Sequence, residues 1–182
     1  MAAALVFDRR KALTVSAWVR VGSDKGGTIV GRLWDAPQFV LGLGVGGTWD
    51  HHRALTFEAC LDCADGPCSF KCFTAIGAPV PLGAWTHVGG VFGGGELRTY
   101  IDGRPAGPPL ELPEPYASAA GLSARGLAPI YAGGHPSWNI LDGGSLDCPS
   151  FWREALDDGQ VRALYLVSRK TCGCPEDAAS AP

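Results

Sequence analysis

The sequence of 182 residues is sparse in charged side chains and has one methionine and one asparagine, Asn139. Neither sign of charge forms a long run, and the formal net charge is −3. A nucleic-acid surface needs a clustered basic face, so we expect no nucleic-acid partner. Polar residues also interrupt the first long apolar alternation, at residues 13–21, and no stretch is long and apolar enough to span a bilayer. We therefore expect no membrane insertion.

The sequence also starts without a recognisable secretory leader. Its first residues, MAAALVFD, lack a basic segment followed by a long apolar one. The length suits one domain that can bury a core. The apolar fraction of 46% is ordinary for a globular protein, which argues against disorder of the whole chain.

What the sequence does have is 26 glycines and 14 prolines, which divide it into short apolar segments. Residues 13–21 alternate with period two, as a half-buried strand does. Further strands are predicted at residues 28–33, 38–45, 54–62, 69–76, 85–92, 96–101, 128–133 and 145–152. Asp65-Gly66 and Asp102-Gly103 predict tight turns, because both residue types tolerate positive φ. Residues 108–125 are predicted to be a long irregular connection.

One helix is predicted near the end of the chain. Leu156, Val161 and Leu164 lie at roughly helical spacing, and Asp157 and Asp158 suit the positive end of a helix dipole. Many short strands followed by one late helix predict an all-β sandwich over residues 1–170. Residues 171–182 are predicted to be a flexible, cysteine-bearing tail.

Seven cysteines are many for this length and favour an oxidising compartment or a metal site. Four of them, Cys60, Cys63, Cys68 and Cys72, are close enough in sequence to bind zinc as thiolates or to form two disulfides across a hairpin. We favour disulfides, with zinc as the alternative. If Cys63 and Cys68 are bridged across the Asp65-Gly66 turn, Cys60 and Cys72 would lie one step out of register, which a bulge could repair.

The other three cysteines are Cys148, Cys172 and Cys174. A disulfide from Cys148 to one of the last two would hold the C-terminal helix against the sandwich. Because seven is odd, one of Cys172 and Cys174 would be left over. That thiol is a candidate for a link to a partner chain.

Three segments in order resemble the laminin-G-like and pentraxin-like branch of the concanavalin A-like lectin/glucanase superfamily. The first is LTVSAWV at residues 13–19. The second is WTHVGGVF at residues 85–92, followed by LRTYIDG at residues 97–103. The third is LDG at residues 141–143, with LD at 146–147 and FWREAL at 151–156. The resemblance implies a two-sheet antiparallel jelly-roll β-sandwich with one short C-terminal helix.

The resemblance also implies functions that the residues support to different degrees. Glucanases of this superfamily carry Glu-x-Asp-x-x-Glu on one strand, and no such pattern is present, so we expect no enzyme. Some relatives bind calcium, and Asp142 and Asp147 are the candidate ligands here. The opening segment before residue 13 is shorter than in the family, which weakens the calcium expectation.

Aromatic and hydrogen-bonding residues in the connections are candidates for a glycan site, since sugars stack on flat rings. These ligand-binding candidates are Trp34, Trp49, Asp50, His51, His52 and Trp138. The alternative is that they are rim residues covering the sheet ends. His87, inside a predicted strand, is expected to be a packed and hydrogen-bonded histidine.

The sequence thus predicts a non-catalytic, extracellular recognition or assembly module that contacts other protein chains. The alternative is a carbohydrate-binding lectin module, with or without calcium. No cofactor is expected beyond possible calcium, or zinc at Cys60–Cys72.

Overall fold

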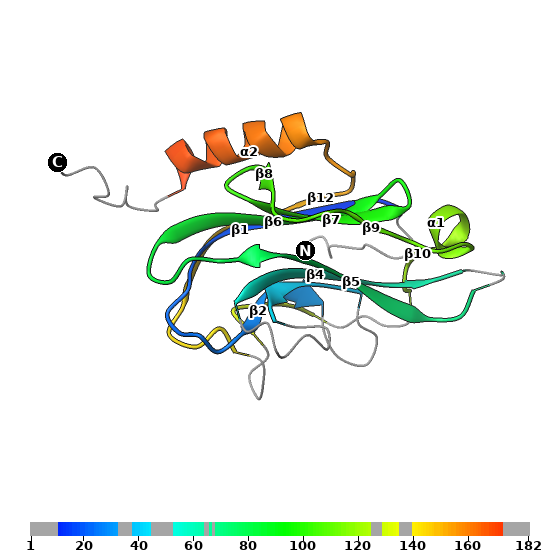
Figure 1. The fold of residues 1–182 in the computed structure, drawn as a ribbon, viewed down its shortest axis with the longest axis horizontal. Coiled ribbons are helices and arrows are strands. Elements are labelled where there is room, and N and C mark those ends of the chain that lie inside the picture. Colours follow the sequence, from blue (N-terminus) through cyan, green and yellow to red (C-terminus); the bar gives the residue numbers. More distant parts are fainter. Residues whose placement is uncertain are drawn as a thin grey trace, which may run out of the picture.

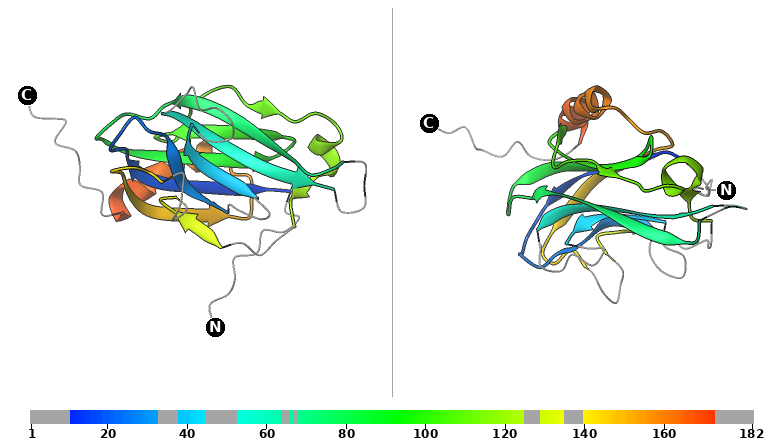
Figure 2. Two further views of the ribbon diagram at one scale, coloured as in Figure 1. Left: turned by 90° about the horizontal axis from the view of Figure 1, so that it is seen from below. Right: turned by 45° about the vertical axis from the view of Figure 1, so that its right-hand side comes forward.

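The computed structural model describes residues 11–32, 38–44, 53–63, 66, 68–124, 129–134 and 140–172. Within these residues, two antiparallel sheets lie face to face, and a C-terminal helix of 14 residues lies on the outer face of one sheet (Figure 1). The two layers and the helix outside them are also seen after rotation (Figure 2). The predicted sandwich with one C-terminal helix is therefore confirmed.

The first sheet has the order β12–β1–β6–β7–β8, with β9 also pairing with β7. Its strands are β1 (Leu13–Arg20), β6 (Trp85–Gly93), β7 (Glu96–Ile101), β8 (Arg104–Pro105), β9 (Leu110–Glu111) and β12 (Ser145–Trp152). Strand β12 is an edge of this sheet, which suits Pro149 because proline cannot donate a ladder hydrogen bond.

The second sheet has the order β10–β4–β3–β2–β11, and β5 pairs with the other side of β4. Its strands are β2 (Gly27–Arg32), β3 (Phe39–Leu43), β4 (Ala54–Asp62), β5 (Lys71–Pro79), β10 (Gly121–Leu122) and β11 (Ile130–Ala132). Two helices complete the described part of the chain, α1 (Tyr116–Ala119) and α2 (Asp158–Thr171). The predicted helix is confirmed.

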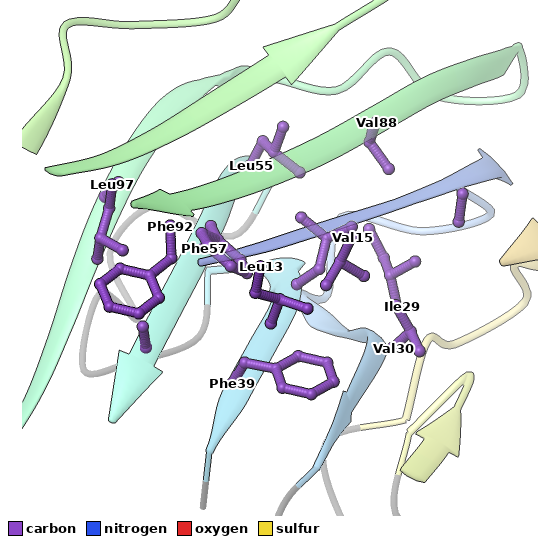
Figure 3. Close-up of a cluster of buried hydrophobic side chains, with 14 of the residues drawn as sticks. Leu13, Val15, Ile29, Val30, Phe39, Leu55, Phe57, Val88, Phe92 and Leu97 are labelled. Atoms are coloured by element: carbon purple, nitrogen blue, oxygen red, sulfur yellow. The ribbon is translucent and has the colours of Figure 1, made fainter. Parts of the chain in front are cut away.

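The core lies between the two sheets and follows the strand alternation. In β1, Leu13, Val15 and Ala17 are fully buried in one cluster with residues of the second sheet such as Phe57. Figure 3 shows Leu13, Val15 and Phe57 pointing into the space between the layers. The sheets approach so closely that a Cβ on Gly90 would lie 2.3 Å from the Phe57 ring.

Two features differ from the sequence prediction. Residues 108–125 are not wholly irregular, because Leu110–Glu111 and Gly121–Leu122 each pair with a strand and Tyr116–Ala119 is helical. Such two-residue pairings are too short to give a periodic signal. Among the described residues, no helix is both long and apolar enough to cross a membrane.

Candidate functional site

Helix α2 covers the outer face of the first sheet, and both of its ends are fixed. At its start, Asp157 caps the helix through a bond from Gln160 N of 2.8 Å, and the Gln160 side chain accepts from Asp157 N. Asp158 accepts a hydrogen bond from the Tyr100 hydroxyl at 2.7 Å and pairs with Arg98 at 3.2 Å. These contacts attach the first turn of the helix to β7.

The later turns of α2 lie over an aromatic cluster. The Trp18 indole donates to Ser168 Oγ at 3.0 Å, and its ring lies 5.7 Å from Tyr165 and 5.5 Å from His87. The alternation of β1 turns Trp18 away from Ala17 and Val19, and the Trp18 side chain is buried under the helix.

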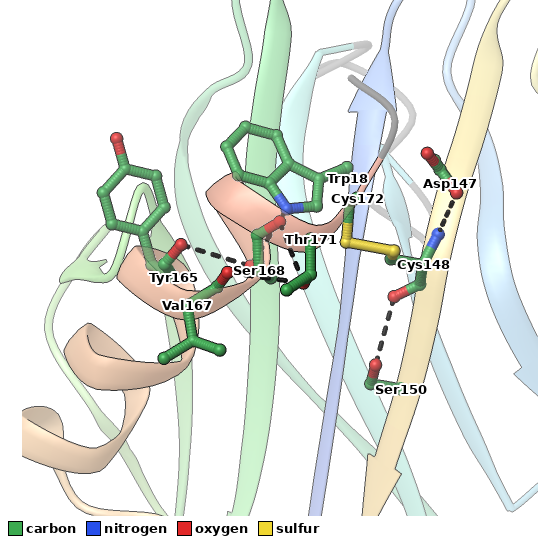
Figure 4. Close-up of a disulfide and its surroundings, with 9 residues drawn as sticks. All are labelled: Trp18, Asp147, Cys148, Ser150, Tyr165, Val167, Ser168, Thr171 and Cys172. Carbon is green, nitrogen blue, oxygen red and sulfur yellow. Dashed lines mark hydrogen bonds between the residues drawn. A yellow bond between two sulfur atoms is a disulfide. The ribbon is translucent and has the colours of Figure 1, made fainter. Parts of the chain in front are cut away.

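A disulfide closes the C-terminal end of α2. Cys172, at the end of the helix, is bonded to Cys148 of β12, as Figure 4 shows beside Trp18 and Ser168. The predicted attachment of the helix is therefore confirmed, with Cys172 as the partner. The outer side of the same helix carries two exposed apolar side chains, Leu166 and Val167, of which Val167 is 61% exposed.

His87 is a strongly perturbed titratable group beneath the helix. Its side chain is buried under α2, and burial lowers the pKa of the imidazole to about 4. The expectation of a packed histidine holds, but its hydrogen bonding is incomplete. The backbone N–H of His87 donates to Asp102 at 3.0 Å, whereas the ring Nδ1 has no hydrogen-bond partner within the described part of the chain.

The four clustered cysteines form two disulfides, Cys60–Cys72 and Cys63–Cys68. The expected register is wrong, because Cys60 and Cys72 lie directly opposite each other in β4 and β5. Cys60 N donates to Gln38 and Cys60 O accepts from Ser123, so neither group points at β5. Such a non-hydrogen-bonded pair brings the two strands closest together. The Cys63–Cys68 disulfide instead lies beyond the paired residues.

Glu58 lies beside the Cys60–Cys72 disulfide, with its carboxylate within 4.8 Å of both sulfurs. The sulfurs are already bonded to each other, so the zinc alternative has no thiolate ligands here. Burial raises the pKa of Glu58, and a 3.1 Å hydrogen bond from Thr74 partly opposes that effect. The carboxylate and the disulfide thus form a structural staple of β4 and β5.

The predicted ligand-binding residues Trp34, Trp49, Asp50, His51, His52 and Trp138 lie outside the described residues, as does Cys174. The glycan site that they were predicted to form remains a prediction.

The two predicted calcium ligands lie within the described part and are already engaged. Asp142 pairs with Lys25 at 3.1 Å, and Asp147 accepts a hydrogen bond from Cys148 N at 2.7 Å. Neither belongs to a group of three ligand-type side chains in the ranges that the structure describes. Calcium needs six or more oxygens, so these two residues alone do not make a site.

Sequence reasoning missed a pair at one end of the first sheet. Arg20 of β1 lies directly opposite Trp85 of β6, with the guanidinium carbon 5.9 Å from the centre of the indole. The alternation of β1 could have placed Arg20 on the same face as Trp18. The pairing with β6 could not be predicted, because 64 residues separate the two side chains in the sequence.

The fold is shared with proteins of distant sequence. A pentraxin from Limulus polyphemus, described as heptameric, is 21% identical with a TM-score of 0.54, covering 87% of this chain and 71% of that one. Botulinum neurotoxin type C is 13% identical with a TM-score of 0.56, covering 88% and 36%. A sialidase from Trypanosoma rangeli is 15% identical with a TM-score of 0.57, covering 88% and 23%. The chain thus spans about a third of the toxin chain and a quarter of the sialidase chain, and these likenesses concern the fold alone.

Among curated proteins, none matches the sequence. A laminin G family model, described as the concanavalin A-like lectin/glucanases superfamily, matches residues 2–162, which include both sheets and the start of α2. The chain therefore belongs to the concanavalin A-like lectin/glucanases superfamily.

Proposed function

We propose that this chain is a non-catalytic module that works outside the cell and holds other protein chains. The observation that carries the proposal is the way its cysteines are paired. Three disulfides within the chain engage six of the seven cysteines, so Cys174 is left over. Disulfides persist in oxidising compartments, which supports an extracellular location.

The position of the remaining cysteine in the sequence suits a link between chains. Cys174 lies two residues after Cys172, which a disulfide attaches to β12. The preceding helix presents Leu166 and Val167 to solvent, and exposed apolar side chains are common in protein interfaces. The heptameric Limulus pentraxin supports the idea that this fold can serve assembly.

The test is the intact mass of the protein from its native source, with alkylation before and after reduction. We expect three internal disulfides and a seventh cysteine bonded to a second chain. Cys174→Ser should abolish the linked species and leave the three internal disulfides. A free seventh thiol in an unlinked monomer would exclude the covalent link, and seven free thiols would exclude the extracellular location as well.

Glycan recognition is the second candidate. Solved structures of similar fold include a botulinum neurotoxin whose cell entry depends on ganglioside molecules and a neurotoxin binding domain in complex with SialylT. We propose Trp49 and its neighbours as the glycan-contacting residues, with Asp142 and Asp147 contributing carboxylates to a calcium site. A glycan array with and without chelator tests both ideas. Loss of a signal in Trp49→Ala would support the lectin function, and an array without any signal would overturn it.

A further inference from the structure

An open hollow of about 400 Å³ lies at one end of the sandwich. Three segments that are distant in sequence line it, through Arg20, Val21, Gly22, Leu82, Gly83 and Gly143. These residues come from the end of β1, from the connection before β6 and from the turn before β12. Its volume is in the range of small-molecule sites and suits one or two sugar rings.

Backbone contacts fix the three segments relative to one another. Val21 pairs with Leu82 in a β-bridge, and Gly83 N donates to Val21 O at 2.9 Å. Gly22 lies so close to Gly143 that a Cβ there would be 2.0 Å from the Gly143 carbonyl oxygen. The backbone frame of the hollow is therefore set by the fold itself.

Arg20 supplies the charge of the hollow. It is exposed on the outer face of the first sheet, and its guanidinium is held over the Trp85 ring. The nearby cations Lys25 and Arg53 are paired with Asp142 and Asp24, at 3.1 and 2.7 Å. In the described ranges no carboxylate forms an ion pair with Arg20. Its fixed positive charge is thus available to a ligand.

The lining selects the chemistry of that ligand. A guanidinium binds a carboxylate through two parallel hydrogen bonds, and the cation–π contact of Arg20 with Trp85 leaves those hydrogen-bond donors unpaired with any acid of the described residues. Leu82, which also lines the hollow and is 44% exposed, offers an apolar surface. Gly83 leaves the mouth open, since a Cβ there would meet nothing within 4 Å. A carboxylate attached to a compact ring with an apolar face fits these features.

We propose that this hollow binds the carboxylate of an acidic sugar residue, with Arg20 as the anion-binding group and Leu82 contacting the ring. A hollow bordered by three short segments suits a single terminal sugar ring better than an extended peptide, which would need a long groove or strand edge. The described residues that line the hollow include neither Cys174 nor any residue proposed above for the glycan site. Failure of the acidic-sugar proposal would therefore leave the assembly proposal untouched.

The test is a titration of ¹⁵N-labelled protein with galacturonic acid and with N-acetylneuraminic acid, following the amide signals of Gly22, Gly83 and Gly143. We expect at least one of the two acids to shift these signals, and methyl galactoside, which lacks the carboxylate, to shift none. Arg20→Gln should weaken binding by about tenfold or more, because hydrogen bonds to a charged group are lost. Gly83→Asn should block the mouth.

Two matched variants control for general effects of the substitutions. Arg153→Gln removes an exposed arginine elsewhere, and Gly94→Asn places asparagine at another glycine with positive φ and free space. Both should bind like the wild type. The proposal would be overturned if neither acid shifted the amide signals of the hollow, or if Arg20→Gln and Arg153→Gln weakened acid binding equally. Stronger binding of N-acetylglutamate than of either sugar acid would reassign the hollow to acidic peptides.

Discussion

At the scale of single residues, His87 connects burial to pH. Its imidazole lies between β6 and α2 against Trp18 and Tyr165, and the low pKa of about 4 means that the folded protein holds it neutral. An unfolded chain takes up the proton near pH 6.5. The contribution of neutral His87 to the free energy of unfolding is therefore fully present above pH 6.5, and it declines as the pH falls toward 4.

We predict that this decline amounts to about 3 kcal/mol between pH 6.5 and 4, from the linkage of proton binding to folding. His87→Gln cannot take up that proton. The difference in unfolding free energy between wild type and variant, measured in urea at several pH values, should shift by this amount in favour of the variant as the pH falls. Asp102 and Glu58 have raised pKa values and act in the opposite direction, but they are common to both proteins. A difference that is constant with pH would contradict the prediction.

The adjacent glycines Gly89 and Gly90 face opposite sides of β6 and should respond differently to the same change. A Cβ on Gly90 would lie 2.3 Å from the Phe57 ring, whereas one on Gly89 would lie 3.4 Å from the nearest atom, Val15 O. Gly90→Ala should therefore destabilise the protein by about 1–3 kcal/mol through overpacking, and Gly89→Ala should not. Thermal unfolding of the two variants checks this. A similar loss in both would mean that the sheets are not in such close contact at Phe57.

At the scale of elements, α2 depends on its attachments more than on buried apolar area. Val161 is its only fully buried side chain, while the capping box, the Arg98 and Tyr100 contacts, the Trp18–Ser168 bond and the disulfide fix it along its length. Sequence reasoning predicted this helix and its disulfide, because both leave local signals. It could not predict what lies under the helix, since that depends on the pairing of β1 with β6.

We predict that Cys148→Ser combined with Cys172→Ser destabilises the protein by about 3 kcal/mol, the cost that chain entropy assigns to a loop of this length. The loss should concentrate in α2. Its last turns should exchange amide hydrogens faster, while β4 keeps its protection. The matched control is Cys63→Ser with Cys68→Ser, which removes a shorter loop far from the helix. Equal loss of protection in α2 for both pairs would contradict a local role.

Ser168 provides a finer test of the same element. Ser168→Ala leaves the buried Trp18 indole N–H without its acceptor, which should cost about 1–3 kcal/mol. Thr171→Ala is the comparison, since the Thr171 hydroxyl bonds only to carbonyls of its own helix and is exposed. Urea unfolding followed by tryptophan fluorescence measures both. If Ser168→Ala lowered the free energy of unfolding no more than Thr171→Ala does, the Trp18–Ser168 hydrogen bond would not be stabilising the helix.

At the scale of the whole molecule, the strand positions followed from the sequence but their arrangement did not. Residues 54–62, 96–101 and 145–152 were predicted with the bounds that the strands have. Their alternation or flanking turns give a local signal. In contrast, β1 pairs with β12 and β6, which lie far along the chain, and no local pattern encodes such neighbours. The hollow beside Arg20 depends on the same long-range order.

One core shared by both sheets implies that they unfold together. Phe39 of the second sheet is fully buried and meets Phe151 of the first sheet edge to face, with ring centres 6.1 Å apart. Phe39→Ala should therefore cost about 3–5 kcal/mol. The loss should be equal whether it is measured by hydrogen exchange in β1 or in β4.

Ile76→Ala is the control, because that side chain is 41% exposed on the same sheet and should cost far less. If Phe39→Ala lowered protection in β4 and left β1 unchanged, the sheets would be separate cooperative units. The hollow would then depend mainly on the first sheet, because Arg20 and Trp85 both belong to it. With a shared core, any destabilised variant loses the hollow only by global unfolding, so the binding effects of Arg20→Gln and Gly83→Asn can be attributed to the site itself.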